Sequence, residues 1–218
     1  MKILEVNKSD FSVSHPSLYE ISDKLDSLTG NTIETINWEE FPYKPSVSFA
    51  ITYTDHEILL KFYITEQYFK AEKTISNQKV NEDSCVELFL SPFADRIYYN
   101  LEFNAIGTCL AAAGTDRNSR VTADPSAIAG IRRLPTMGNK PIREQKGDCS
   151  WSLTVALPFE IFFLHRINDL KGSSLRANFY KSGDKLSEPH YLTWSPVSSE
   201  KPDFHRPEYF GILKFVCG

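Results

Sequence analysis

Apolar and polar residues alternate along much of this chain. From Tyr99 to Asn104, every second residue is aromatic or aliphatic, and the residues between them are asparagine or glutamate. A repeat of two residues is typical of a strand with one buried face, because successive side chains point to opposite sides of a sheet. Strands are predicted on this basis at 46–53, 57–65, 85–90, 97–106, 128–134, 151–157, 175–181, 190–194 and 210–216. Many short strands separated by turn residues predict an all-β fold, an antiparallel β-sandwich resembling a jelly roll.

One or two short peripheral helices accompany the predicted strands. Leucine and isoleucine residues recur at helical spacing between Leu18 and Leu28, and Gly30 follows as a stop. A second helix of one or two turns is expected after Pro158, since a proline at the first helical position loses no hydrogen bond.

The remaining segments give a simple division of the chain. The polar stretches 67–81 and 117–125 are predicted to be loops, and 136–147 a hairpin connection with proline and glycine. We expect residues 1–37 to form an N-terminal extension that packs on one β-sandwich domain, residues 38–218.

Composition excludes several classes of partner. The formal net charge of −4 argues against nucleic acid, whose phosphates need a basic face. No window approaches the ~20 apolar residues of a membrane-spanning helix, so no membrane partner is expected. Without a visible signal peptide, the chain is expected in the cytoplasm, or outside it or in the periplasm if a signal has been removed.

The four cysteines are scattered along the chain and form no CxxC pair. Zinc binding is therefore not expected, and no other metal site is assigned. Cys85 lies in an apolar run, where a buried free thiol is the ordinary outcome. The spacing of the cysteines leaves disulfide formation open.

The stretch from Pro189 to Gly211 combines prolines, aromatic rings, two histidines and an arginine. A proline-stiffened irregular segment must lie at the surface, where its backbone polar groups can be satisfied. Packing of the loop on the core explains Tyr191 and Phe210. The cluster of Phe204, His205 and Arg206 favours recognition of a ligand.

Polar side chains on the predicted strands form a second candidate feature. Glu87 lies opposite the apolar face of its strand, so either hydroxyl groups of a ligand or an arginine such as Arg176 could satisfy its carboxylate. Two strand faces together could form a polar floor suited to hydroxyl groups, or only a wet outer surface. The residues of these two faces are Asn100, Glu102, Asn104, Arg176, Asn178 and Tyr180.

The chain resembles the family 9 carbohydrate-binding modules, in particular their stand-alone domains, over residues 38–216. The resemblance is carried by the order of DSCVELFL (83–90), YYNLEFNAIGT (98–108), WSLTVALPFEIF (151–162), RANFYK (176–181) and YLTWSP with FHRPEYFGILKF (191–215). It implies a β-sandwich that binds sugar, often at the end of a glycan chain, with structural calcium in some members and no other cofactor.

The family's binding positions are only partly kept here. Glu87 stands at the place of a family carboxylate and Asn104 at that of an asparagine, while Glu102 replaces an arginine. Phe204 stands at the place of the aromatic residue in the C-terminal loop. The partnering tryptophan is missing, because Val80 and Asn81 occupy that region.

These observations predict a noncatalytic protein that recognises a mono- or oligosaccharide through an aromatic platform and a polar strand face. No catalytic residues are assigned. One alternative is a glycoside hydrolase that uses Glu87 and Glu102, and another is a binding or scaffold protein with a degenerate sugar site. The predicted carbohydrate-binding residues are Glu87, Glu102, Asn104, Asn178, Tyr180, Phe204, His205 and Arg206.

Overall fold

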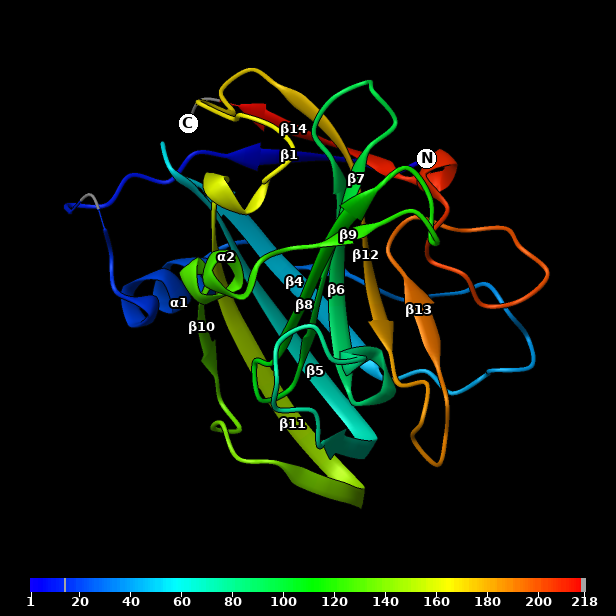
Figure 1. Cartoon of the computed structure of the whole chain (residues 1–218). Coiled ribbons are helices and arrows are strands. Elements are labelled where there is room, and N and C mark those ends of the chain that lie inside the picture. Colours follow the sequence, from blue (N-terminus) through cyan, green and yellow to red (C-terminus); the bar gives the residue numbers. More distant parts are fainter. Residues whose placement is uncertain (14, 217–218) are drawn as a thin grey trace.

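Two β-sheets packed face to face make up the protein (Figure 1). The structure, a computed structural model, describes residues 1–13 and 15–216. Within them, the larger sheet has 9 strands, with β1-β14-β12-β6-β7-β8-β9 as its main order, β13 beside β12, and β3 beside β13. Its strands are β1 (Ile3–Asn7), β3 (Thr35–Ile36), β6 (Cys85–Ser91), β7 (Tyr98–Asn104), β8 (Cys109–Gly114), β9 (Val121–Thr122), β12 (Ser174–Ser182), β13 (Tyr191–Thr193) and β14 (Gly211–Val216).

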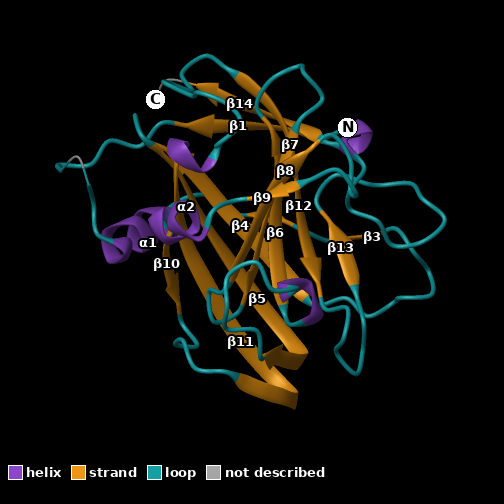
Figure 2. Ribbon diagram, viewed as in Figure 1, coloured by secondary structure: helices purple, strands orange, loops and turns teal. Residues whose placement is uncertain are grey.

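The smaller sheet has five strands in the described residues, ordered β10-β11-β5-β4-β2. They are β2 (Asn31–Thr32), β4 (Ser46–Tyr53), β5 (Glu57–Ala71), β10 (Arg132–Pro135) and β11 (Ile142–Pro158). Helices are few and lie outside the sheets (Figure 2). They are α1 (Leu18–Asp26), α2 (Pro125–Gly130) and the 3-10 turns η1 (Val80–Glu82), η2 (Phe159–Ile161) and η3 (Pro207–Tyr209).

The predicted antiparallel β-sandwich is confirmed. Paired strands run antiparallel, apart from β1, which lies parallel to β14. Inward-facing side chains of both sheets form one hydrophobic core, in which Phe49 of the small sheet stacks on Phe179 of the large one at 3.8 Å between ring centroids. The alternation in the sequence therefore identified the faces that meet between the layers.

Several boundaries predicted from the sequence were wrong. Strand β5 continues to Ala71, and β11 begins at Ile142, because the two pair with each other through irregular register beyond the core. The segment predicted as a strand at 128–134 contains the end of α2 and then β10. Asp124 caps α2 and Pro125 occupies its first turn, and these local signals outweigh the short apolar run.

The outer face of the small sheet is covered by the predicted helix α1. Ile21 and Leu25 pack on Ala50, Leu59 and Ala156. A capping box at Ser17 begins the helix. The residues preceding position 38 also contribute β1 and β3 to the large sheet and β2 to the small one, so this segment is part of both layers.

The outer face of the large sheet is covered only in part. Rings from β6, β7 and β12 form a second apolar cluster beneath the segment that connects β13 and β14. Its buried members are Trp38, Phe89, Tyr98, Tyr180, Val197, Phe204 and Phe210. The predicted surface loop at 189–211 is therefore fixed by aromatic packing, and the neighbouring part of the outer face is left free to form a site.

Two further findings concern membranes and cysteines. No helix in the described residues has the length and apolar composition needed to cross a membrane. Cys85, Cys109 and Cys149 are free thiols. Cys217 lies outside the described residues.

A buried ion pair connects the two sheets. The Lys181 ammonium of β12 lies 2.8 Å from Glu66 Oε2 of β5, and both side chains are completely buried. Trp151 donates a hydrogen bond to the other oxygen of Glu66. Burial, together with the Lys181 charge, lowers the pKa of His190 well below its usual range, so its neutral ring accepts a hydrogen bond from Lys181.

Removing one partner of this pair should be far more harmful than removing an exposed one. Lys181→Met leaves the Glu66 charge buried without its counterion, and we expect the free energy of unfolding to fall by about 3–5 kcal/mol. Lys8→Met, which breaks the solvent-screened pair with Asp55, should change the free energy of unfolding far less. Urea unfolding of both variants measures the difference, and equal losses would contradict the structural role of Lys181.

Candidate functional site

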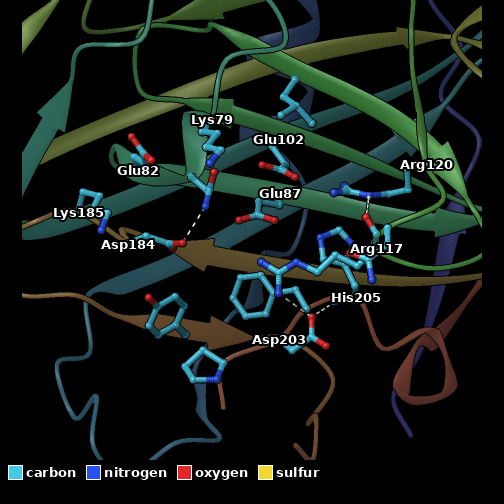
Figure 3. A pocket seen from close by; sticks show the side chains of 16 residues that line it. Lys79, Glu82, Glu87, Glu102, Arg117, Arg120, Asp184, Lys185, Asp203 and His205 are labelled. Carbon is cyan, nitrogen blue, oxygen red and sulfur yellow. Dashed lines mark hydrogen bonds and ion pairs between the residues drawn. The ribbon is translucent and has the colours of Figure 1, made fainter.

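A polar pocket of about 460 Å³ opens on the outer face of the large sheet (Figure 3). Its floor is formed by side chains of β6, β7 and β8, and its walls by four segments that join strands. These segments contain residues 79–82, 117–120, 184–185 and 202–205. The site is therefore assembled from distant parts of the chain over one patch of sheet.

The floor is a straight row of residues across neighbouring strands. Tyr180 of β12 pairs with Glu87 of β6, Glu87 pairs with Glu102 of β7, and Glu102 pairs with Leu110 of β8. Directly opposed residues in an antiparallel pair have Cβ atoms about 4.5–5.5 Å apart. The two glutamates consequently lie side by side at the base of the pocket.

Both floor glutamates are buried, with exposed fractions of 2% for Glu87 and 6% for Glu102. Ser182 Oγ donates to Glu87 Oε1 at 2.7 Å, and Asn100 Nδ2 donates to Glu102 Oε1 at 2.8 Å. Burial, and then the charge of Glu102, raise the pKa of Glu87 well above its usual value. Burial raises the pKa of Glu102 to about 7, against the hydrogen bond from Asn100. The pair therefore retains a proton near neutral pH.

The loop between β8 and β9 brings two arginines to the pocket. Asp116 accepts hydrogen bonds from the backbone of Asn118 and Ser119, which folds the loop back on itself. Gly114 permits this return, since a Cβ there would lie 2.8 Å from the Arg120 Cα. Arg117 and Arg120 both line the pocket as a result.

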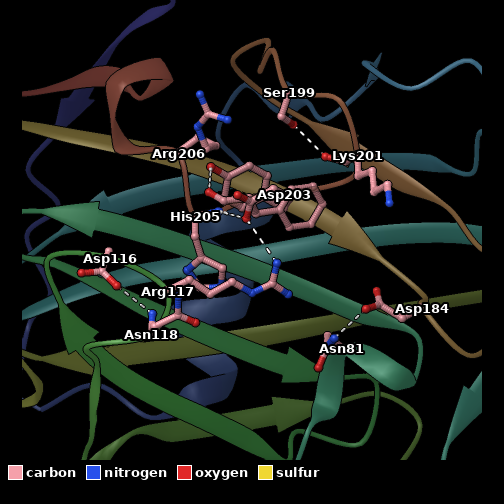
Figure 4. A network of polar contacts seen from close by, with 12 residues as sticks. Asn81, Asp116, Arg117, Asn118, Asp184, Ser199, Lys201, Asp203, His205 and Arg206 are labelled. Carbon is pink, nitrogen blue, oxygen red and sulfur yellow. Dashed lines mark hydrogen bonds and ion pairs between the residues drawn. The ribbon is translucent and has the colours of Figure 1, made fainter.

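The C-terminal loop forms the opposite wall. Asp203 accepts a hydrogen bond from the His205 backbone at 3.1 Å and lies 3.4 Å from the Arg117 guanidinium, across the mouth of the pocket (Figure 4). His205 Nδ1 lies 2.9 Å from the Tyr98 hydroxyl. Burial, followed by the charges of Arg120 and Arg117, lowers the pKa of His205 to about 3, so this ring is neutral.

A hydrogen-bonded pair, Asn81 and Asp184, forms the other end of the pocket (Figure 4). Asn81 Nδ2 donates to Asp184 Oδ2 at 2.7 Å, and the Asp184 backbone N–H donates to the Asn81 carbonyl. Burial raises the pKa of Asp184. The position that would hold a tryptophan in the resembled family therefore carries this amide–carboxyl contact.

Two aromatic side chains also line the pocket, Phe204 and Tyr191. Phe204 is 8% exposed, and one face of its ring stacks on Tyr180 with centroids 4.1 Å apart and planes 10° apart. Tyr191 is half-buried and meets Phe204 edge to face at 6.1 Å. Phe204 is thus part of the packing as well as of the wall.

Of the residues proposed from the sequence, Glu87, Glu102, Phe204 and His205 meet in this pocket. Tyr180 lies beneath it, with its hydroxyl donating to the Phe204 carbonyl.

Three proposed residues lie elsewhere. Asn104 holds the 73–83 segment through the Lys73 carbonyl and Asp83, and Asn178 bonds the Ser195 backbone. Arg206 pairs with Glu208 outside the pocket lining. The expected polar floor is therefore narrower than the alternation suggested, because the two asparagines satisfy buried backbone groups.

Sequence reasoning missed Arg117, Arg120, Asp184 and Tyr191 as lining residues. The two arginines stand in a polar segment without periodicity, and Asp184 lies three residues beyond the end of a predicted strand. The charged residues in DRNSR (116–120) were the one feature of the sequence that could have indicated a binding loop. The sequence alone could not place that loop over β6 and β7. The suggested contact of Glu87 with Arg176 is absent, since Arg176 donates to the Pro207 carbonyl.

Possible metal ligands were compared across the part of the chain that the structure describes. Among the described residues, no group of three or more His, Cys, Asp or Glu side chains is arranged to hold a metal ion. Calcium takes six to eight oxygen ligands, usually several of them carboxylates. Backbone and amide carbonyls also serve as calcium ligands, so structural calcium stays an expectation from the family resemblance.

Comparison with known proteins places these features in a family. The model for the family described as "Carbohydrate-binding family 9" matches residues 20–215. A crystal structure of a candidate carbohydrate-binding protein from Bacteroides uniformis is 39% identical, with a TM-score of 0.94, and the match covers 98% of this chain and 99% of that one. A search of curated proteins finds no match.

More distant structures share the fold. A family 9 carbohydrate-binding module from Caldicellulosiruptor kristjanssonii in complex with glucose is 13% identical, with a TM-score of 0.53 over 98% of this chain and 95% of that one. The complex of such a module with cellotriose gives 11% identity and a TM-score of 0.54, covering 100% and 95% of the two chains. At these identities the similarity concerns the β-sandwich alone.

The raised pKa of Glu102 has a consequence for stability. A carboxyl group whose pKa rises on folding contributes stability below its unfolded value, 4.5, and loses it as the pH rises through about 7. The contribution of Glu102 to the free energy of unfolding should therefore fall by on the order of 3 kcal/mol between these pH values. In Glu102→Gln this part of the slope should disappear, as measured by urea unfolding at several pH values. Parallel profiles of the two proteins would rule out the perturbed carboxyl.

Proposed function

This chain belongs to carbohydrate-binding family 9, a family of noncatalytic binding modules, and we propose that its outer-face pocket binds a mono- or oligosaccharide. The observation that carries this proposal is the pocket itself, whose base presents two buried carboxyl groups side by side. Its volume of about 460 Å³ lies within the usual range for small-ligand sites.

The chemistry of the walls suits a polyhydroxylated ring. Sugar hydroxyls are both donors and acceptors. Glu87, Glu102 and Asp184 offer acceptor oxygens, whereas the guanidinium groups of Arg117 and Arg120 offer donors. Sugar hydroxyls that contact both the carboxyl and the guanidinium groups would replace water at these polar atoms. A ligand without such hydroxyls would leave the atoms without hydrogen bonds and would bind more weakly.

The aromatic side chains of this pocket do not enclose a ligand between two rings on opposite sides. Tyr191 and Phe204 stand on the same side, and Asn81 and Asp184 form the end wall. We propose that apolar contact comes from this side alone, and that hydrogen bonds supply most of the selectivity. The glucose and cellotriose bound by the Caldicellulosiruptor modules make hexoses and short glucans the first ligands to try.

Exchange of single arginines tests the proposal. Arg120→Ala removes a charged donor from the pocket wall, and we expect affinity for the bound sugar to fall about tenfold to a hundredfold. Arg206→Ala is the matched control, because Arg206 pairs with Glu208 away from the lining. Calorimetric titration with a panel of mono- and oligosaccharides gives the affinities. Absence of binding to the whole panel would favour a scaffold with a degenerate site, and equal losses in both variants would exclude this pocket.

The adjacent glutamates raise glycoside hydrolysis as a second candidate. The two carboxyl groups of a hydrolase flank the scissile bond, with the acid and the nucleophile or base on different sides of it. Glu87 and Glu102 instead occupy neighbouring strands of one floor. We therefore expect no turnover of chromogenic glycosides between about pH 5 and 8. Turnover that is lost in Glu87→Gln would establish the hydrolase instead.

A further inference from the structure

We propose that the pocket selects amino sugars, with the ligand's ammonium group seated between the carboxyl groups of Glu87 and Glu102. This inference rests on the proposed function, since it concerns which saccharide the same pocket prefers. It follows from the position of the two glutamates, the contacts that they lack and the charges around them.

The carboxyl groups of Glu87 and Glu102 line the pocket, and each accepts a hydrogen bond from the protein through only one of its two oxygens. Ser182 and Asn100 each donate to one carboxyl oxygen, Oε1 of Glu87 and Oε1 of Glu102. Within residues 1–13 and 15–216, no hydrogen bond or ion pair reaches Oε2 of either side chain. Both glutamates are more than nine-tenths buried and line the pocket (Figure 3). The Oε2 atoms are therefore the carboxyl oxygens that are open to the cavity, and no donor in the described part of the chain reaches them.

A cation is the donor that such a pair favours. Two carboxylates on opposed residues repel each other, and burial makes the repulsion stronger. A proton relieves it in the empty pocket. An ammonium group between the two oxygens would relieve it as well and would add charge-assisted hydrogen bonds.

The protein supplies no such cation at short range. In the described part of the chain, no Lys, Arg or His nitrogen lies within ion-pair distance of Glu87 or Glu102. The charged and titratable groups around the pair come from every segment that packs on it. They are Lys79 and Glu82 of the η1 segment, Cys85 of β6, Arg117 and Arg120 of the β8–β9 loop, Tyr180 of β12, Asp184 and Lys185 beyond β12, and Asp203 and His205 of the C-terminal loop.

These groups favour an organic cation that carries hydroxyl groups. A metal ion would need more ligands than two carboxyl groups, and the side chains nearby do not form a chelating cluster. The arginines on the wall suit neutral hydroxyl oxygens of the same ligand. An amino sugar combines a compact ammonium with hydroxyl groups on one ring, and an N-acetylated sugar lacks the charge.

Binding by this route exchanges one cation for another. The protons held by the carboxyl pair leave to the solvent, both carboxylates become ionised, and the ammonium takes their place with its own protons retained. Burial raises the pKa of Glu102 to about 7 and the pKa of Glu87 well above its usual value, so at about pH 6 the empty pair holds about one to two protons to release. A neutral sugar gives no such exchange.

Calorimetry on the full chain at about pH 6, where amines of this kind are protonated, tests the inference. Three matched sets are titrated, each comprising a hexose, its 2-amino derivative and its N-acetylated derivative, from glucose, galactose and mannose. We expect the amino sugar of at least one set to bind about tenfold tighter than its hexose, the range of one charge-assisted hydrogen bond. Titrations in buffers of different ionisation enthalpy should show release of about one to two protons.

Variants locate the effect. In Glu102→Gln the preference for the amino sugar over the hexose should fall towards parity and proton release should fall by about one proton, whereas Glu160→Gln, an exposed carboxylate on η2, should keep both at the unmodified level. If Glu102→Gln does not fold, proton release by the unmodified protein decides the question. Hexose binding without an amino-sugar preference or proton release overturns this inference and leaves the proposed function standing. Failure of every sugar to bind overturns both.

Discussion

The register of β12, β6 and β7 is the constraint on which the rest of the structure depends. Each of these strands is buried on both faces, with one set of side chains in the inter-sheet core and the other on the outer face. A shift of one residue in any pairing would exchange the two sets, and would place glutamate in the core and leucine in the pocket. The apolar core therefore fixes the positions of Glu87 and Glu102, although it touches neither charge.

Other parts of the structure contribute the free energy of folding that offsets the cost of burying these carboxyl groups. The inter-sheet core, the aromatic cluster around Tyr180 and the pair of Lys181 with Glu66 hold the strands in place. Perturbed carboxyl groups cluster at functional sites, where a desolvated group is ready for a ligand that completes its hydrogen bonds. At the floor of the pocket, each glutamate keeps one carboxyl oxygen that no donor in the described chain reaches.

The sequence predicted the sandwich well because alternation is a local signal that survives in isolated strands. Glu87 and Glu102 followed from the same signal, since each lies between apolar neighbours. Asn104 and Asn178 follow the same pattern but satisfy the backbone of distant segments, which no pattern within one strand reveals. Arg117 and Asp184 depend on how loops return over the sheet, and that path is set by contacts such as the close approach at Gly114. Periodicity in the sequence thus predicts which segments form strands, whereas the positions of the loops can be known only from the tertiary structure.

The rim and the floor of the pocket also differ in how they respond to dissolved ions. The contact between Arg117 and Asp203 spans the mouth with side chains exposed by 57% and 29%. Mobile counterions screen such a surface pair within about 8–10 Å at ordinary ionic strength, whereas buried groups are shielded from them. Concentrated electrolyte therefore loosens the entrance before it weakens the anchoring groups beneath. Ionic strength would therefore change the rates at which a ligand enters and leaves the pocket more than it changes the ligand's affinity.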